Sequence, residues 1–221
     1  MVRDGLYYGA GLTIAGVLVS ALVRPWSGLP LFVLAAFCLY FFRDPEREIP
    51  GGPVAVSPAD GKVVVIRPEG PAGTRISIFL NIFDVHVNRT PIAGTITEVK
   101  YRKGRFLVAS KEVASVQNEQ NTVVVEGNGT RVVFSQIAGL IARRIVFNKR
   151  QGDKVSAGER IGMIKFGSRM DVVLGPEWDI VVQEGMHVAA GSSVLARRND
   201  VQPSNETATQ MSTLEPVACR S

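Results

Sequence analysis

A glycine–serine pair and two histidines are the residues of this chain whose types best suit chemistry. Gly167-Ser168 lies in "IKFGSRMDVVLG", His86 in "IFDVHVNRTP" and His187 in "EGMHVAAG". No Cys or His cluster has the spacing of a metal site, no glycine-rich phosphate loop precedes a helix, and no Gly-x-Ser-x-Gly turn occurs. The sequence therefore predicts no metal site and none of the common cofactor loops.

Three further polar residues complete the candidate set. Asp60 precedes a glycine in "SPADGKVV", and Asn118 and Asn121 occur in "VQNEQN". Taken singly, each candidate has a structural explanation, because Asp-Gly pairs form ordinary turns and the Gly-Ser pair recurs at 191–192. Their order along a β-rich chain is what favours a catalytic site.

The elements that would position these residues begin with two apolar runs, which predict a helical membrane hairpin. Residues 5–23 hold no charged side chain, and as a helix they span about 28 Å against a hydrocarbon core of about 30 Å. Residues 27–42 form a second uncharged run of 16 residues, so a full span and a re-entrant half of a hairpin both stay open. A cleaved signal peptide is the competing interpretation, but its apolar region is usually only about 7 to 15 residues long.

The charges around the apolar runs predict a cell-membrane protein with its main domain on the cytoplasmic side. Arg43, Arg47, Lys62 and Arg67 follow the second run, whereas the turn between the runs offers only Arg24. The two cysteines form no disulfide framework. The formal net charge is +5, but the cations are scattered and aromatic residues make up only 7%, which argues against a nucleic-acid partner.

Beyond the hairpin, short β-branched runs separated by glycine and proline predict a mainly β sandwich or barrel-like domain. Residues 149–164 and 181–196 share the pattern Gly-x-x-Val-x-x-Gly, and "SPADGKVVVI" and "TPIAGTITEV" share Pro-x-x-Gly. These repeats resemble the half-motifs of biotinyl and lipoyl carrier domains, so we expect hairpins of that kind. The predicted organisation is a membrane helical hairpin over residues 1–43, a β-rich domain over 44–198 and a disordered polar tail over 199–221.

The repeats keep open an alternative without catalysis, a membrane-tethered biotinyl/lipoyl-like carrier or assembly module. A carrier needs a lysine presented at a hairpin tip for acylation. Lys165, which is followed by Phe-Gly-Ser, is the candidate that the sequence offers. Lys165 and Ser168 therefore distinguish the two interpretations, because the carrier needs the first and an enzyme needs the second.

Taken together, the sequence blocks resemble the short form of the phosphatidylserine decarboxylase family. "FFRDPER", "SPADGKVV", "FLNIFDVHVNRTPIAG", "NEQN", "KFGSR" and "HVAAGSSVLA" occur in the family's order over roughly residues 40–198. The chain departs from the longer bacterial form, which has a Leu-Gly-Ser-Thr cleavage motif and a second histidine three residues after the first. Phe-Gly-Ser-Arg stands at 166–169 here, and Arg89 occupies the place of the second histidine.

The resemblance implies a proenzyme that makes its own pyruvoyl cofactor from Ser168. The serine hydroxyl would attack the Gly167 carbonyl and split the chain into fragments 1–167 and 168–221, which would remain associated. The pyruvoyl ketone would then accept electrons from phosphatidylserine bound from the bilayer, yielding phosphatidylethanolamine and CO2. Another amino-headgroup lipid, or a small amino acid, stays open as the substrate, and so does association into a homo-oligomer.

The resemblance also assigns roles to the candidate residues. His86 would supply a proton to the substrate α-carbon, since the ordinary imidazole pKa of about 6.5 lies near working pH. Asp60 would help to activate the serine, but Arg89 stays protonated and is a poor base. Either His86 serves both stages or Asp60 works with a different partner, and His187 is a weaker third candidate. The residues expected to bind the anionic headgroup are Arg143, Arg144, Arg169 and Asn118.

Overall fold

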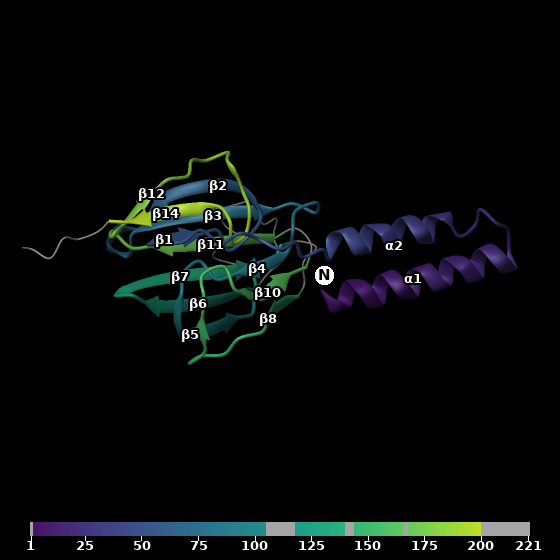
Figure 1. Ribbon diagram of the computed structural model, residues 1–221, viewed down its shortest axis with the longest axis horizontal. Coiled ribbons are helices and arrows are strands. Elements are labelled where there is room, and N and C mark those ends of the chain that lie inside the picture. Colours follow the sequence, from purple (N-terminus) through teal and green to yellow (C-terminus); the bar gives the residue numbers. More distant parts are fainter. Residues whose placement is uncertain (1, 105–117, 140–143, 166–167, 200–221) are drawn as a thin grey trace, which may run out of the picture.

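A helical hairpin and a β domain make up the described part of the chain. This computed structural model describes residues 2–104, 118–139, 144–165 and 168–199. The hairpin projects from one end of the β domain, and the N-terminus lies where the two parts meet (Figure 1). The tail predicted over 199–221 lies outside the described residues from position 200 onward.

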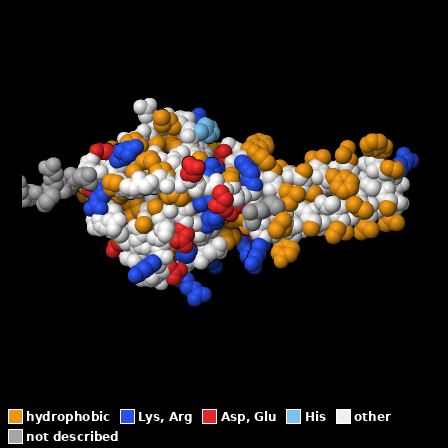
Figure 2. All heavy atoms as spheres, in the orientation of Figure 1, with side chains coloured by type: hydrophobic (Ala, Val, Ile, Leu, Met, Phe, Trp, Pro, Cys, Tyr) orange, Lys and Arg blue, Asp and Glu red, His pale blue; other side chains and the backbone are white. Residues whose placement is uncertain are grey.

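Helices α1 (Arg3–Leu22) and α2 (Leu29–Phe41) run side by side in opposite directions (Figure 1). α1 has 20 residues and is the one helix of the described ranges that is long and apolar enough to cross a membrane. α2 has 13 residues, or about 20 Å, against a hydrocarbon core of about 30 Å. Hydrophobic side chains cover the visible face of the hairpin (Figure 2). The length and composition of α1 fit membrane association, whereas α2 is short for a full span.

Glycines of α1 allow the two helices to approach closely. The buried residues of α1 are Gly5, Gly9 and Gly16. A Cβ atom at Gly9 would lie 2.6 Å from the Leu39 side chain, and one at Gly16 would lie 2.8 Å from the Phe32 ring. Small residues at such contacts are a common way for helices to pack in lipid. The hairpin is therefore a packed unit and not two independent helices.

The β domain consists of antiparallel strands in one large and two small sheets. In spatial order, the large sheet contains β13 (His187–Val188), β2 (Gly61–Pro68), β3 (Thr74–Leu80), β11 (Ser168–Leu174), β7 (Thr130–Ile137), β6 (Gln120–Gly127), β5 (Gly94–Arg102) and β9 (Lys154–Val155). One small sheet contains β1 (Val54–Val56), β14 (Val194–Arg198) and β12 (Trp178–Ile180). The other contains β4 (Val87–Arg89), β10 (Arg160–Ile164) and β8 (Ile145–Phe147). A 3-10 turn, Gly70–Ala72, joins β2 to β3. The mainly β prediction is confirmed.

The hydrophobic core lies between the curled large sheet and the two small sheets. Ile78 and Phe134 of the large sheet are fully buried in one cluster with Ile164 of β10 and Leu195 of β14. The small sheets therefore cover the apolar inner face of the large one.

Side chains alternate between the two faces of β11, and this alternation orients Ser168. Met170, Val172 and Leu174 are fully buried in the core cluster. Because strand side chains have a period of two residues, Ser168 shares their inner face, whereas Arg169 points to the other side of the sheet.

The β domain has an internal twofold repeat with a spacing of 33 residues. Val188 of β13 pairs with Gly61 of β2 at one edge of the large sheet, and Val155 of β9 pairs with Gly94 of β5 at the other. The differences 94 − 61 and 188 − 155 both equal 33. The two small sheets also correspond: β14 is the central strand between β1 and β12 in one, and β10 is the central strand between β4 and β8 in the other. Both halves of the domain therefore follow one strand order.

The repeated segments take equivalent places in this fold, but the prediction of biotinyl/lipoyl-like hairpins is not confirmed. Within 149–164, β9 pairs with β5, whereas β10 pairs with β4 and β8. Within 181–196, β13 pairs with β2, whereas β14 pairs with β1 and β12. The shared glycines Gly158 and Gly191 have φ angles of 71° and 80°, which favour glycine. Each turn carries the chain from the large sheet to a small one, so its two strands cannot pair with each other.

The segment after α2 fastens the hairpin to the β domain through ion pairs. Asp44 lies 2.8 Å from Arg160 Nε and 3.4 Å from Arg89 Nη2. Arg47 Nη2 lies 2.7 Å from Asp60 Oδ2. The block "RDPER" therefore anchors the hairpin to the domain that carries the candidate residues.

Candidate active site

Ser168 and His86 lie at the end of the β domain that meets the hairpin. Ser168 is the first residue of β11 and pairs with Leu80, the last residue of β3. His86 stands between β3 and β4, and its carbonyl oxygen accepts a hydrogen bond of 3.3 Å from the Ile164 nitrogen of β10. The Phe41 ring at the end of α2 packs against the His86 ring, with centroids 4.3 Å apart. The fold thus places the His86 ring against the hairpin and Ser168 at the start of its strand, opposite the end of β3.

Both side chains are fully buried. Ser168 Oγ and His86 Nε2 have no hydrogen-bond partner among the described residues. Leaving a buried polar group unpaired costs about 1–3 kcal/mol, so each such group in a native structure requires an explanation. Here the two groups are a hydroxyl nucleophile and an imidazole nitrogen, which suits nucleophilic chemistry.

His86 is a neutral imidazole whose basic nitrogen, Nε2, meets no partner within the described ranges. Nδ1 lies 2.9 Å from the Asp84 carbonyl oxygen, and because a carbonyl only accepts hydrogen bonds, Nδ1 carries the proton and Nε2 the lone pair. Burial lowers the pKa of His86 to about 4, against the smaller raising effect of the Asp84 carbonyl. At neutral pH His86 is therefore a base, and the ordinary pKa used in the sequence argument does not apply.

Asp60 has both carboxylate oxygens engaged within the chain. Oδ2 accepts a hydrogen bond of 2.7 Å from Arg47, and Oδ1 accepts one of 2.7 Å from the Ala190 nitrogen. Burial raises the pKa of Asp60, while the Ala190 hydrogen bond and the Arg47 charge act in the opposite direction. Its contacts hold the segment after α2 and the turn after β13 next to the start of β2.

Arg89, which stands where the longer family form has its second histidine, connects the hairpin segment to the β domain. Nη1 donates to the Gly158 carbonyl at 3.0 Å, and Nη2 donates to the Pro45 carbonyl at 3.2 Å and to Asp44 Oδ1 at 3.4 Å. The Arg89 side chain is nearly buried. A guanidinium stays protonated, so Arg89 does not act as a base. It contributes packing and hydrogen bonds.

Replacing Arg89 by Met should destabilise the fold and leave self-cleavage intact. The substitution removes three hydrogen bonds of a nearly buried cation while Asp44 keeps its Arg160 partner, so we expect the free energy of unfolding to fall by about 2 kcal/mol. Unfolding of uncleaved Ser168→Ala chains with and without the change measures this loss. Arg160→Met, at a more exposed ion pair, is the control and should cost less than about 1 kcal/mol. A folded but uncleaved Arg89→Met chain would contradict the structural role.

Arg169 lies on the outer face of the large sheet and is fully buried. Its Nε donates to Asp171 Oδ1 at 2.6 Å, and its Nη2 donates to Ser77 Oγ at 2.5 Å. This predicted headgroup ligand is therefore held inside the protein, next to Ser168 in sequence but on the opposite face of β11.

The other residues predicted to bind the headgroup differ in solvent exposure. Arg144 is exposed, directly before β8. Asn118 is fully buried, and its Nδ2 donates to the Ala138 carbonyl at 2.7 Å. Arg143 and the predicted cleavage residue Gly167 lie outside the described residues. Among the described candidates, Arg144 is the one open to an incoming lipid.

Lys165 does not stand at an exposed hairpin tip. Its Nζ lies 2.7 Å from Asp4 Oδ2 in the first turn of α1. The Phe42 and Tyr8 ring centroids lie 5.5 and 5.9 Å from the same ammonium, and the Lys165 side chain is only 12% exposed. This environment does not suit the presentation of an acylated lysine. His187 is exposed on β13, at one edge of the large sheet.

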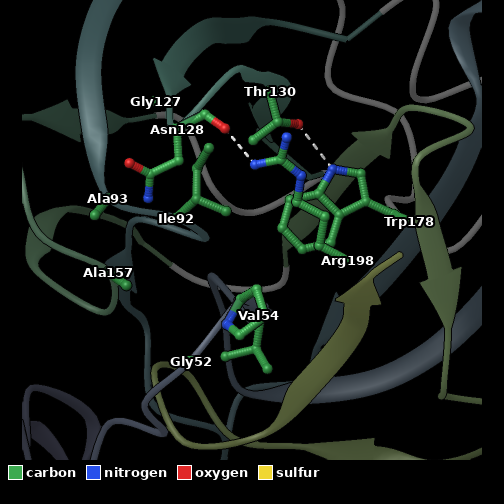
Figure 3. Close-up of a pocket in the computed structure, with 11 residues that line it drawn as sticks. Gly52, Val54, Ile92, Ala93, Gly127, Asn128, Thr130, Ala157, Trp178 and Arg198 are labelled. Carbon is green, nitrogen blue, oxygen red and sulfur yellow. Dashed lines mark hydrogen bonds between the residues drawn. The ribbon is translucent and has the colours of Figure 1, made fainter. Parts of the chain in front are cut away.

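A pocket of about 250 Å³ lies at the end of the domain away from the hairpin, with Trp178 among its lining residues (Figure 3). Pro53 and Ala93 also line it. These positions correspond through the 33-residue repeat to His86 and Asp60, since 86 − 53 and 93 − 60 both equal 33. In the repeat, the apolar residues Pro53 and Ala93 at the far end therefore take the positions that His86 and Asp60 take at the hairpin end.

Sequence reasoning missed one buried amide beside the site. Asn88, two residues after His86, is fully buried, and its Nδ2 has no hydrogen-bond partner among the described residues. Its only sequence signal was its place within the block "DVHVNR".

Comparison with known proteins identifies one family. The family model described as phosphatidylserine decarboxylase matches residues 34–196. A phosphatidylserine decarboxylase proenzyme from Solibacter usitatus is 65% identical over 200 residues, which cover 90% of this chain and 98% of the relative. Proteins of the same name from Oleidesulfovibrio alaskensis and Nitratidesulfovibrio vulgaris are each 44% identical, over 86% of this chain and 91% of theirs.

Proposed function

The chain belongs to the phosphatidylserine decarboxylase family, and we propose that it matures by cleaving itself before Ser168. It is an enzyme that decarboxylates phosphatidylserine, which yields phosphatidylethanolamine and CO2. The observation that carries the self-cleavage proposal is that two buried atoms, Ser168 Oγ and His86 Nε2, have no hydrogen-bond partner in the described part of the chain. A nucleophile and a base kept free inside an uncleaved chain suit a reaction of the chain with itself.

Self-cleavage begins when the Ser168 hydroxyl attacks the carbonyl carbon of the preceding residue. The Oγ–C bond forms, the hydroxyl proton passes to His86 Nε2, and the oxyanion then collapses, which breaks the C–N bond and returns a proton to the nitrogen. The product is an ester. Loss of the α-proton of residue 168 expels the carboxylate of residue 167 and leaves dehydroalanine. Addition of water and loss of ammonia then give a pyruvoyl group on fragment 168–221.

The residues present fit the formation and use of this group. Ser168 is buried on the inner face of the large sheet. When formed, the pyruvoyl group supplies a sink for the electrons that CO2 leaves behind. We propose that His86 serves both reactions. In self-cleavage its Nε2 takes the proton of the Ser168 hydroxyl, and in decarboxylation it holds the proton that the substrate α-carbon receives.

Strand pairing explains how the two fragments would stay together. β11 begins fragment 168–221 and lies between β3 and β7 of the other fragment. β13 pairs with β2, and β14 pairs with β1. Cleavage before β11 therefore leaves the shorter fragment hydrogen-bonded in the middle of the large sheet.

The hairpin would bring the active site to its lipid substrate. A lipid with two acyl chains does not leave a bilayer readily, so the enzyme must work at the membrane surface. We propose that Arg144, which is exposed, contacts the phosphate or carboxylate of the headgroup. Arg43 and Arg47 follow α2, and they favour a cytoplasmic position for the β domain at the cell membrane.

Intact mass spectrometry of the purified chain tests self-cleavage. We expect two fragments that meet between residues 167 and 168, the smaller one lighter by one ammonia than its hydrolysis product would be. A folded, active enzyme that remains a single chain would overturn the proposal. The same spectrum addresses the carrier alternative, because an acyl mass increment on Lys165 would support a carrier, and we expect none.

A further inference from the structure

Three buried amide side chains form a hydrogen-bonded chain across the interior of the β domain. Asn121 Nδ2 donates to Gln136 Oε1 at 3.1 Å, and Gln136 Nε2 donates to Asn88 Oδ1 at 2.9 Å. Asn88 and Gln136 are fully buried, and Asn121 is nearly so. The chain links β6 and β7 of the large sheet to β4 of a small sheet.

The direction of these hydrogen bonds fixes which end of the Asn88 amide is free. Gln136 Nε2 also lies 3.4 Å from the Val146 carbonyl oxygen, which can only accept. Gln136 Nε2 must therefore point toward the Val146 carbonyl and Asn88, and the Asn88 side-chain oxygen must be the atom that accepts from it. Asn88 Nδ2 is left with no partner among the described residues. Two N–H bonds of a fully buried amide thus find no acceptor within the described part of the uncleaved chain.

Strand register places Gln136, the hydrogen-bond partner of Asn88, near the reacting serine. Gln136 is opposite Met170 in the β7–β11 pair, and Met170 shares the inner face of β11 with Ser168. Asn88 follows His86 by two residues, and both are fully buried. Gln136, which is bonded to Asn88, is thus close to Ser168, and Asn88 itself is close to His86 in sequence.

We propose that Asn88 is a catalytic residue of self-cleavage that donates a hydrogen bond from Nδ2 to the oxyanion of the attacked peptide. The inference rests on the proposed function, because attack by Ser168 Oγ moves the carbonyl π electrons onto the oxygen. A preorganised amide donor is suited to stabilise that charge. The donor has no partner among the described residues of the uncleaved chain, so we assign it to the first reaction.

The rate of self-cleavage during cell-free synthesis into lipid vesicles tests the assignment. We expect Asn88→Ala to lengthen the cleavage half-time by about 10²- to 10³-fold, as for loss of one oxyanion donor. Gln136→Met keeps the Asn88 amide but removes the group that orients it, so it should slow cleavage less, by about tenfold. Thr130→Val removes a buried hydrogen-bonding hydroxyl at the far end of the domain and should cleave at the normal rate.

Thermal unfolding separates a catalytic from a structural role. In the uncleaved Ser168→Ala background, Asn88→Ala and Gln136→Met both break the Gln136–Asn88 hydrogen bond, so we expect them to lower the melting temperature by similar amounts. If Asn88 were merely structural, the two variants would also slow cleavage to a similar extent. Either that result or normal cleavage of Asn88→Ala would overturn the inference. Failure of the unmodified chain to cleave would instead overturn the proposed function.

Discussion

Replacing Ser168 by Ala should leave one uncleaved chain with no decarboxylase activity. A methyl group cannot attack the preceding carbonyl, so the electron sink never forms and activity should fall by more than about 10⁴-fold. Because Ser168 Oγ has no hydrogen-bond partner among the described residues, the alanine should fold as well as serine. Gel electrophoresis measures the cleavage, release of CO2 from labelled phosphatidylserine measures the activity, and thermal unfolding checks the fold.

The chain contains its own control for this experiment. A second glycine–serine pair, Gly191-Ser192, lies in the turn between β13 and β14, where Gly191 has a φ angle of 80°. Ser192→Ala should cleave and decarboxylate normally, because this serine is not placed beside His86. Cleavage of Ser168→Ala at its usual position, or loss of cleavage in Ser192→Ala, would show that the reacting serine has been misidentified.

Local patterns in the sequence were sufficient to predict the β class and to nominate Ser168 and His86. Short β-branched runs specify strands by themselves, and the blocks "DVHVNR" and "KFGSR" are contiguous. The repeats also pointed to a real internal symmetry. Their hairpin interpretation failed because Gly158 and Gly191 each connect strands of different sheets, and sheet membership depends on partners far away in the chain.

The role of Arg89 could not be predicted for the same reason. Its hydrogen-bond partners Asp44 and Gly158 are 45 and 69 residues away in sequence. The free amide of Asn88 likewise follows from contacts with Gln136, 48 residues away. Such pairings arise from tertiary packing, which one sequence alone does not display. The pKa of His86 could not be predicted either, because Phe41 of the helical hairpin helps to bury its ring.

The low pKa of His86 leads to the second large prediction, a pH dependence of self-cleavage. With a pKa of about 4, His86 remains about 99% unprotonated at pH 6, whereas an imidazole with the ordinary pKa of about 6.5 would be about 75% protonated. The cleavage rate should therefore stay level from pH 8 to pH 6 and fall only near pH 4. His86→Gln should cleave about 10²- to 10⁴-fold more slowly, since it lacks the base. A rate that halves near pH 6.5 would contradict the buried, neutral state of His86.

The same shift should make the uncleaved fold less stable in acid. The pKa of His86 is lower in the folded chain than in the unfolded chain, so between pH 6.5 and pH 4 the unfolded state binds more protons. Stability is therefore complete above pH 6.5 and should fall by about 3 kcal/mol on the way to pH 4. Asp60, whose pKa is raised by burial, acts with the opposite sign as the pH falls toward its own titration range. Denaturant unfolding of Ser168→Ala, with and without His86→Gln, isolates the histidine, because the glutamine chain should lose this slope. An unchanged slope would mean that other groups carry the acid sensitivity and that His86 is not the buried base.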